Sequence, residues 1–346
     1  MAQYRFSIPP VYFSNSICQL RSLCFTPDMP QKYLFRLFGG LAVSTILFCG
    51  QDAQQYSGPA HRWSFLQSSH FKGKAEMARY TGTVLRYGKP REAELMLITV
   101  LEPFRREQLV KSESDTDYYV IKQNQVMTYQ TGVYPYRQMN SVFWELESGR
   151  FRKATMSTQE WCGQTYKELR VKGKTMQFFY SSYWENESRG YETIRRPGPS
   201  FSAFLYDELP LLIRKDDLSN ADSARMFPML MSSRVKQPDW DIGNPLRRPE
   251  YRPAQMTVEK GKLTWKGEER AVRIVTVLQA PVETKKATIP EKKDVFYVDL
   301  DSELRPLLRW ERNDGGVLEL QSLDYTDYWN QNDPGDRLPE KATIPQ

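Results

Sequence analysis

Short stretches rich in aromatic and β-branched residues, separated by glycine-containing turns, cover most of the chain between residues 75 and 323. A glycine supplies the positive φ that a tight hairpin needs. The turn glycines are Gly88, Gly149, Gly173, Gly261, Gly267 and Gly315. The pattern predicts strands at 75–87, 91–101, 118–128, 141–146, 151–157, 165–171, 175–183, 256–259, 262–265, 270–278, 295–300, 305–312 and 317–323. About a dozen strands joined by tight turns indicate an antiparallel meander, and a sheet of that width must curl, close or fold onto itself.

A proline- and arginine-rich stretch interrupts this run at residues 195–200. Ser200 suits the N-cap of a short helix over residues 201–214, and residues 221–235 are typical of a second short helix. Residues 236–254 contain four prolines and predict an extended connection. We therefore expect a mainly β fold, an open barrel or half-barrel, with these helices covering one face or plugging its opening.

The N-terminal segment has the organisation of an export signal. Residues 29–36 are basic, residues 37–48 carry no charge, and Cys49 follows them. This segment resembles a bacterial lipoprotein signal peptide, although Phe48 stands where a small residue is usual. The resemblance implies lipid attachment at Cys49 and a location in the cell envelope, anchored at the outer membrane and facing the periplasm or the surface. Residues 1–28 then precede the true start.

These boundaries divide the chain. We expect residues 29–48 to be a signal peptide, 49–62 a tether, 63–329 a single β-rich domain, and 330–346 a polar, disordered tail.

The net charge of +6 does not indicate a nucleic-acid partner. Residues 1–48 account for half of it, and the remaining basic pairs are scattered along the chain. Tracking a phosphate backbone requires a clustered basic face. The sequence therefore predicts a solvated surface and no nucleic-acid binding.

Cys162 is the one candidate for nucleophilic catalysis, because Cys18 and Cys24 precede the expected start and Cys49 is the expected lipid site. A thiol hydrolase needs a histidine to take the thiol proton. His61 and His70 are the only histidines, and both lie upstream of Cys162. Their spacing matches no zinc pattern, so we expect no metal and no cofactor. A small buried apolar side chain is the alternative role for Cys162.

Three segments between residues 73 and 184 resemble a family of uncharacterised bacterial envelope lipoproteins of Bacteroidetes type. They are residues 73–76 running into 86–91, residues 131–136, and residues 157–164. Some members carry the label "septum formation inhibitor Maf", but this sequence has no Ser-Pro-Arg-Arg type motif opening an α/β fold. The motif residues, of unknown role, are Tyr134, Pro135, Tyr136, Gln159, Glu160, Trp161, Cys162, Gly163 and Gln164. The strand pattern also resembles the half-barrel carriers of the LolA type.

Together these features predict a non-enzymatic, lipid-anchored binding or assembly module. Its curved sheet would hold an apolar or peptide-like ligand, or dock onto another envelope protein. The alternative is an envelope thiol hydrolase that uses Cys162. The aromatic run at residues 178–184 would leave both faces of its strand apolar, which fits a central strand packed against the core.

Overall fold

The computed structural model describes residues 63–337, except for 115–116, 186, 199, 201, 236–237, 240–243, 246–248 and 284–287. Contacts divide the chain into residues 1–50 and residues 51–346, and every described residue belongs to the second unit. The predicted start, signal peptide, lipid site and tether lie outside the described residues, as does the tail beyond residue 337. No helix in the described part of the chain has the length and apolarity needed to cross a bilayer.

The chain forms one large sheet and two small ones. The strands of the large sheet that come first in the chain are β1 (Ala75–Arg86), β2 (Lys89–Arg105), β3 (Val110–Lys111), β4 (Tyr118–Thr131), β5 (Tyr134–Glu145), β6 (Arg150–Glu160), β7 (Gly163–Lys172), β8 (Thr175–Ser182) and β9 (Arg189–Arg195). Those that come later in the chain are β10 (Ser202–Leu205), β11 (Ala221–Phe227), β14 (Arg252–Trp265), β15 (Glu268–Gln279), β18 (Lys292–Asp299), β19 (Leu307–Arg312) and β20 (Val317–Thr326). The small sheets pair β12 (Pro238–Asp239) with β13 (Asn244–Pro245) and β16 (Val282–Glu283) with β17 (Thr288–Ile289).

The large sheet has 16 strands and curls without closing. Its neighbours run β10, β11, β14, β15, β18, β19, β20, β1, β2, β4, β5, β6, β7, β8, β9, with β3 beside β2. All pairs are antiparallel except β10 with β11. The curl brings distant strands face to face: Phe227 of β11 lies edge-on to Phe178 of β8, with ring centroids 6.4 Å apart. The predicted curled antiparallel meander is confirmed.

Most predicted hairpins are present, and one is wrong. The turns at Gly88, Gly149, Gly173, Gly267 and Gly315 all have positive φ. Gly261, however, lies within the continuous strand β14 and pairs with Val272 of β15. A Cβ at this position would lie 2.6 Å from Cδ1 of Ile274. The glycine therefore makes room for a neighbouring side chain and does not form a turn.

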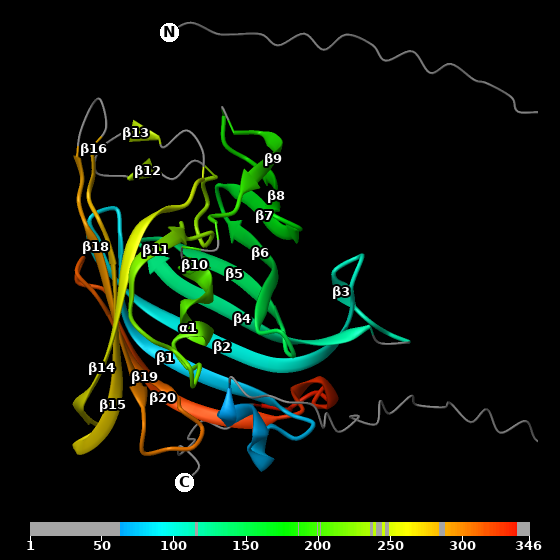
Figure 1. Cartoon of the computed structure of the whole chain (residues 1–346), viewed down its shortest axis with the longest axis vertical. Helices are drawn as coiled ribbons and strands as arrows, with labels where there is room; N and C mark the ends of the chain where they lie inside the picture. Colours follow the sequence, from blue (N-terminus) through cyan, green and yellow to red (C-terminus); the bar gives the residue numbers. More distant parts are fainter. Residues whose placement is uncertain are drawn as a thin grey trace, which may run out of the picture. The chain divides into compact units, whose positions relative to one another are not determined.

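The segment predicted to be helical, residues 202–235, lies on the concave face of the sheet (Figure 1). We call it the interior segment. Its elements are β10, the 3₁₀ turn η3 (Tyr206–Glu208), the short helix α1 (Leu209–Leu212) and β11, followed by residues 228–235 without regular structure. The helix predicted over 201–214 shrinks to four residues, and the helix predicted over 221–235 is wrong. β11 instead gains backbone partners from β10 and β14, which outweigh the weak local preference for a helix.

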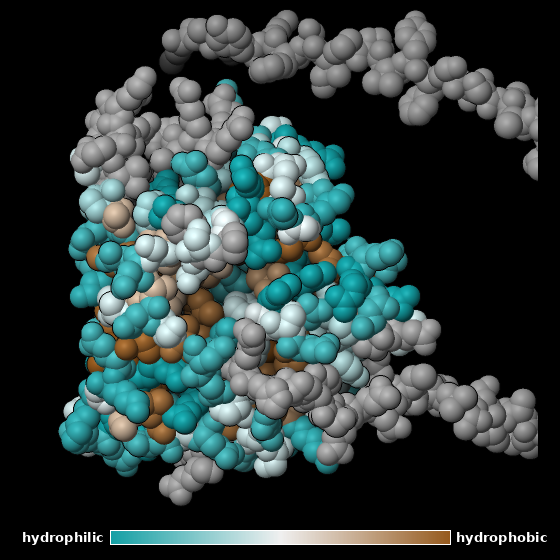
Figure 2. Space-filling view, viewed as in Figure 1, coloured by the Kyte–Doolittle hydropathy of each residue, from teal (hydrophilic) through white to brown (hydrophobic). Residues whose placement is uncertain are grey.

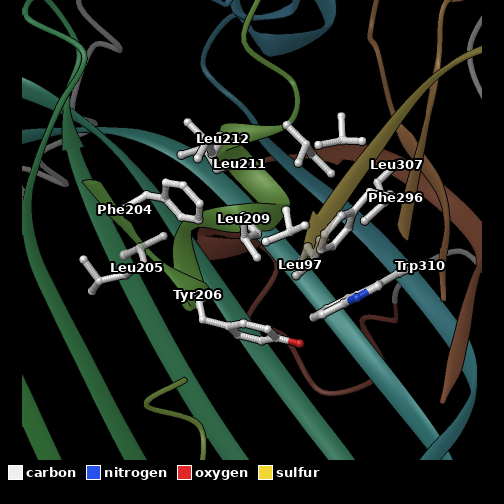
Figure 3. Packing of buried hydrophobic residues seen from close by; sticks show 14 of the residues in the cluster. Leu97, Phe204, Leu205, Tyr206, Leu209, Leu211, Leu212, Phe296, Leu307 and Trp310 are labelled. Atoms are coloured by element: carbon white, nitrogen blue, oxygen red, sulfur yellow. The ribbon is translucent and has the colours of Figure 1, made fainter. Parts of the chain in front are cut away.

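Apolar side chains of the interior segment form the middle of the core. Leu209 lies beside Leu97 and Phe296, and the ring of Tyr206 extends towards that of Trp310 (Figure 3). On the face shown in Figure 2, apolar residues appear in patches between larger polar areas. The concave side of the sheet is thus largely filled by the chain itself.

Candidate functional site

The motif residues noted in the sequence gather at one end of the sheet. Tyr134 and Pro135 begin β5, Glu160 ends β6, and Gly163 begins β7. The rings of Tyr134 and Trp161 lie 6.4 Å apart, and Tyr136 stacks on Tyr129 with centroids 4.9 Å apart. Four hairpin turns meet at this end, at residues 87–88, 132–133, 161–162 and 183–188. We call these four turns the aromatic rim.

Several motif positions have a local structural explanation. Gly163 has a φ of 143°, and a Cβ there would lie 2.3 Å from Cγ of Tyr183, so the tyrosine ring requires a glycine beneath it. Glu160 is buried and accepts a hydrogen bond of 3.1 Å from Nε2 of Gln138, and burial raises its pKa. Gln159 and Gln164 pair across the β6–β7 ladder with exposed side chains.

Cys162 is exposed and has no histidine nearby among the described residues. His70 packs against Tyr325, with ring centroids 5.5 Å apart, and Tyr325 pairs with Glu76 at the start of β1. β1 has 12 residues and spans about 40 Å. His70 precedes the first residue of β1, whereas Cys162 lies in a turn at the level of its last residue. His61 lies outside the described residues. The expectation of a buried Cys162 is wrong, and its alternative role as a nucleophile stays a prediction.

The inner face of β4 to β7 carries polar side chains that bind the backbone of the interior segment. Gln125 donates to the carbonyl of Asp207 at 2.6 Å, and Thr165 donates to the carbonyl of Ser233 at 2.8 Å. Asn140 donates to the Asp207 carboxylate at 2.7 Å, which accepts the Leu230 amide at 2.7 Å. Buried backbone groups outside regular ladders need such partners.

Lys167 of β7 is the centre of this polar face. Its ammonium donates to three carbonyls of the interior segment, those of Leu230, Ser232 and Arg234, at 2.8, 2.7 and 2.5 Å. An ammonium has three protons to donate, which matches the three acceptors. Burial lowers the pKa of Lys167 to about 7, although the carboxylates of Asp207 and Glu187 act in the opposite direction.

A second buried cation fixes the part of the interior segment that follows helix α1. Arg214 forms a two-pronged ion pair with Glu76 of β1, at 2.6 and 2.8 Å, and donates to the carbonyl of Leu304. Tyr325 donates to the same Glu76 carboxylate at 2.6 Å. The Arg214 guanidinium also lies 3.6 Å from the centroid of the Phe65 ring.

A pocket opens between the interior segment and the sheet. Met127 and Trp310 line it from the sheet, and Tyr206, Met229 and Met231 line it from the interior segment. The Tyr206 hydroxyl and the Trp310 indole both donate to Oδ1 of Asp294, at 2.8 and 2.9 Å, which fixes the two rings. The cavity volume is ≈ 40 Å³, room for only a few water molecules. A larger guest therefore requires the methionine side chains to move.

Sequence reasoning missed Glu76, Lys167, Asp207 and Arg214. One available signal was parity along a strand: Lys167 alternates in step with Thr165 and Leu169, both of which are buried. A lysine at an inward position predicts a buried polar partner. Among the described residues, no group of three or more histidine, cysteine, aspartate or glutamate side chains is arranged to hold a metal ion.

Comparison with known proteins gives a distant structural neighbour. No family model and no curated protein matches the sequence. A crystal structure of a beta-barrel-like protein of domain of unknown function DUF1849 from Brucella abortus superposes with a TM-score of 0.42. The two share 10% sequence identity, and the match covers 73% of this chain and 98% of that chain.

Proposed function

We propose that this protein is an exported, lipid-anchored envelope protein that acts as a non-enzymatic binding module for an apolar or peptide-like ligand. The observation that carries this proposal is the pocket between the interior segment and the concave face of the sheet. Methionines line it, and methionine side chains rearrange easily around guests of different shape. A guest would enter here by displacing Met229 and Met231 from the sheet.

Native mass spectrometry tests the ligand part of the proposal. The chain from residue 50 onwards would be exported to a periplasm and purified without detergent. We expect a reproducible extra mass of lipid or peptide size that is released on denaturation. A clean mass of the protein alone would contradict a stably bound ligand and favour docking onto another envelope protein.

A matched pair of variants tests whether the pocket is the site. Met231→Trp fills the pocket, and Met139→Trp adds the same bulk on the exposed side of β5. We expect Met231→Trp to lose the extra mass and Met139→Trp to keep it. Loss in both variants, or in neither, would remove the pocket from the proposal.

The anchor has a test of its own. Intact mass of the membrane-extracted protein should match a chain that begins at Cys49 and carries acyl groups. A mass that includes residues 29–48, or a Cys49 without acyl groups, would contradict lipid anchoring without affecting the ligand result.

A further inference from the structure

The four turns of the aromatic rim each present an exposed apolar or aromatic side chain. The exposed fractions are 44% for Tyr87, 83% for Val133, 73% for Trp161 and 63% for Tyr183. Each residue belongs to a different hairpin, namely β1–β2, β4–β5, β6–β7 and β8–β9. These hairpins are neighbours in the sheet, so the tips follow one another at intervals of about 10 Å along a line of about 30 Å.

The opposite ends of the same strands differ in character. The turns at residues 146–149 and 173–174 expose Glu147 and Lys174, and their one large apolar residue, Leu146, is buried. Polar residues are the ordinary choice for turns in water. The third connection at that end, between β2 and β4, exposes one apolar residue, Val110. Exposed apolar residues are therefore concentrated at the rim, where all four turns carry one, and hairpin formation alone does not explain them.

From this juxtaposition we propose that the aromatic rim inserts into the interfacial region of an anionic lipid bilayer. Tryptophan and tyrosine prefer the membrane–water interface, where the ring is buried and its polar atom stays hydrated. A row of separate exposed side chains can contact a continuous, deformable surface such as a bilayer at several points at once. A single bound molecule would instead need a pocket that encloses it.

The charges beside the tips fit such a surface. Lys89, Arg137 and Arg189 are exposed and lie within a few residues of the tips, against Glu92 and Glu185. Basic residues close to an anionic leaflet strengthen binding. The proposal depends neither on a ligand in the pocket nor on acylation of Cys49.

A fluorescent reporter at Cys162, next to Trp161, tests the proposal. The full chain would carry Cys18→Ser, Cys24→Ser and Cys49→Ser, with an environment-sensitive dye on Cys162. A matched chain would carry Cys162→Ser and Lys174→Cys, which moves the dye to the opposite end of the sheet. Vesicles of phosphatidylcholine and phosphatidylglycerol are the probe, some with a nitroxide quencher on the lipid.

We expect a blue shift and quenching by the nitroxide lipid for the dye at Cys162 and neither for the dye at position 174. Both chains share the apolar stretch 37–48, so attachment through that stretch cannot produce the difference. Adding Val133→Ser and Tyr183→Ser should lower the quenched fraction at Cys162 about tenfold, through the lost interfacial side chains. A chain that stays off the vesicles, or that binds while the Cys162 dye remains in water or behaves like the position 174 dye, would overturn the proposal.

Discussion

Two buried cations hold the interior segment, and they do so in different ways. Arg214 belongs to the segment and meets a carboxylate of the sheet, Glu76. Lys167 belongs to the sheet and donates its hydrogen bonds to backbone carbonyls of the segment, while the carboxylates of Asp207 and Glu187 act on it without a direct hydrogen bond. A charge matched by a charge keeps its protonation state, whereas a charge held by dipoles loses more on burial than it recovers. Burial acts to lower the pKa of Arg214, but the Glu76 carboxylate more than offsets it and the pKa is raised. Burial lowers the pKa of Lys167 to about 7, so the attachment of residues 230–234 titrates near neutrality.

The largest expected loss of stability comes from breaking the ion pair between Arg214 and Glu76. Glu76→Gln leaves the Arg214 charge buried without a counter-ion, which should lower the free energy of unfolding by about 3–5 kcal/mol. Glu94→Gln on the adjacent strand β2 is the control, because its pair with Arg79 is exposed and should contribute less than about 1 kcal/mol. Urea denaturation of both variants gives the comparison. Equal losses would show that Glu76 has no special role.

Removing Lys167 should have a smaller effect near pH 7, and the size of this effect should depend on pH. Lys167→Met leaves three carbonyls without donors, at a cost of about 1–3 kcal/mol near pH 7. The pKa of Lys167 is about 7 in the folded chain, against 10.5 as the ordinary value. Between these values the unfolded chain binds the extra proton, so the Lys167 contribution to stability grows as pH rises.

Denaturation of wild type and Lys167→Met at pH 7, 8.5 and 10 measures this prediction. The destabilisation by Lys167→Met should increase over the series. Lys262→Met, at an exposed site beside Glu269, is the control and should show no such trend. A destabilisation by Lys167→Met that is constant or falls with pH would contradict a depressed pKa.

The contribution of Glu208 to stability should change with pH in the opposite direction to that of Lys167. The Glu208 carboxylate accepts the Leu205 amide at 2.7 Å, and burial raises its pKa to about 8. The unfolded carboxyl ionises near 4.5, so the Glu208 contribution falls as pH rises from 4.5 to 8. Glu208→Gln should match wild type near pH 4.5 and be about 1–3 kcal/mol more stable at pH 8.5. Thermal unfolding at both pH values tests this, and a variant less stable than wild type at pH 8.5 would refute it.

The smallest expected effect is at the aromatic rim. Trp161→Ser and Val133→Ser remove exposed side chains and should change stability by less than about 0.5 kcal/mol. Trp144→Ser is the contrast, because its ring packs edge-on against Trp63 in the core and its loss should cost about 3–5 kcal/mol. A large loss in either rim variant would give the rim a structural role and weaken the membrane proposal.

The hairpins were predictable because their signals are local: a glycine in the turn and strand-forming residues on each side. The first half of β5 was not predicted, because Gln138 and Asn140 point inwards and remove the apolar–polar alternation. Those residues are polar because Glu160 and Asp207, far along the chain, lie opposite them. β11 was not predicted for a similar reason, because its partner strand β14 begins 25 residues after β11 ends. Sequence patterns report local preference, and these features depend on distant contacts.

The candidate site divides in the same way. The motif around Trp161 and Cys162 was visible in the sequence, and the structure brings its residues together at one end of the sheet. The interior polar face was not visible, because Lys167 and Arg214 resemble any surface cation until their burial is known. A thiol–histidine pair at Cys162 finds no partner among the described residues, since His70 lies at the far end of β1.

The pairing of β1 with β20 has a consequence for how the chain folds. In the large sheet, the strands from β10 to β20 come first and those from β1 to β9 follow, so that β20 pairs with β1 while β9 and β10 lie at opposite edges. Most strands of each half pair with a strand that is close to them in the chain, but the seam joins Ala75 to Thr326 and must wait for the whole chain. Contacts this far apart in sequence slow folding. The interior segment already ties the two halves together through Lys167 and Phe178, but the sheet itself becomes continuous only once residue 326 is made.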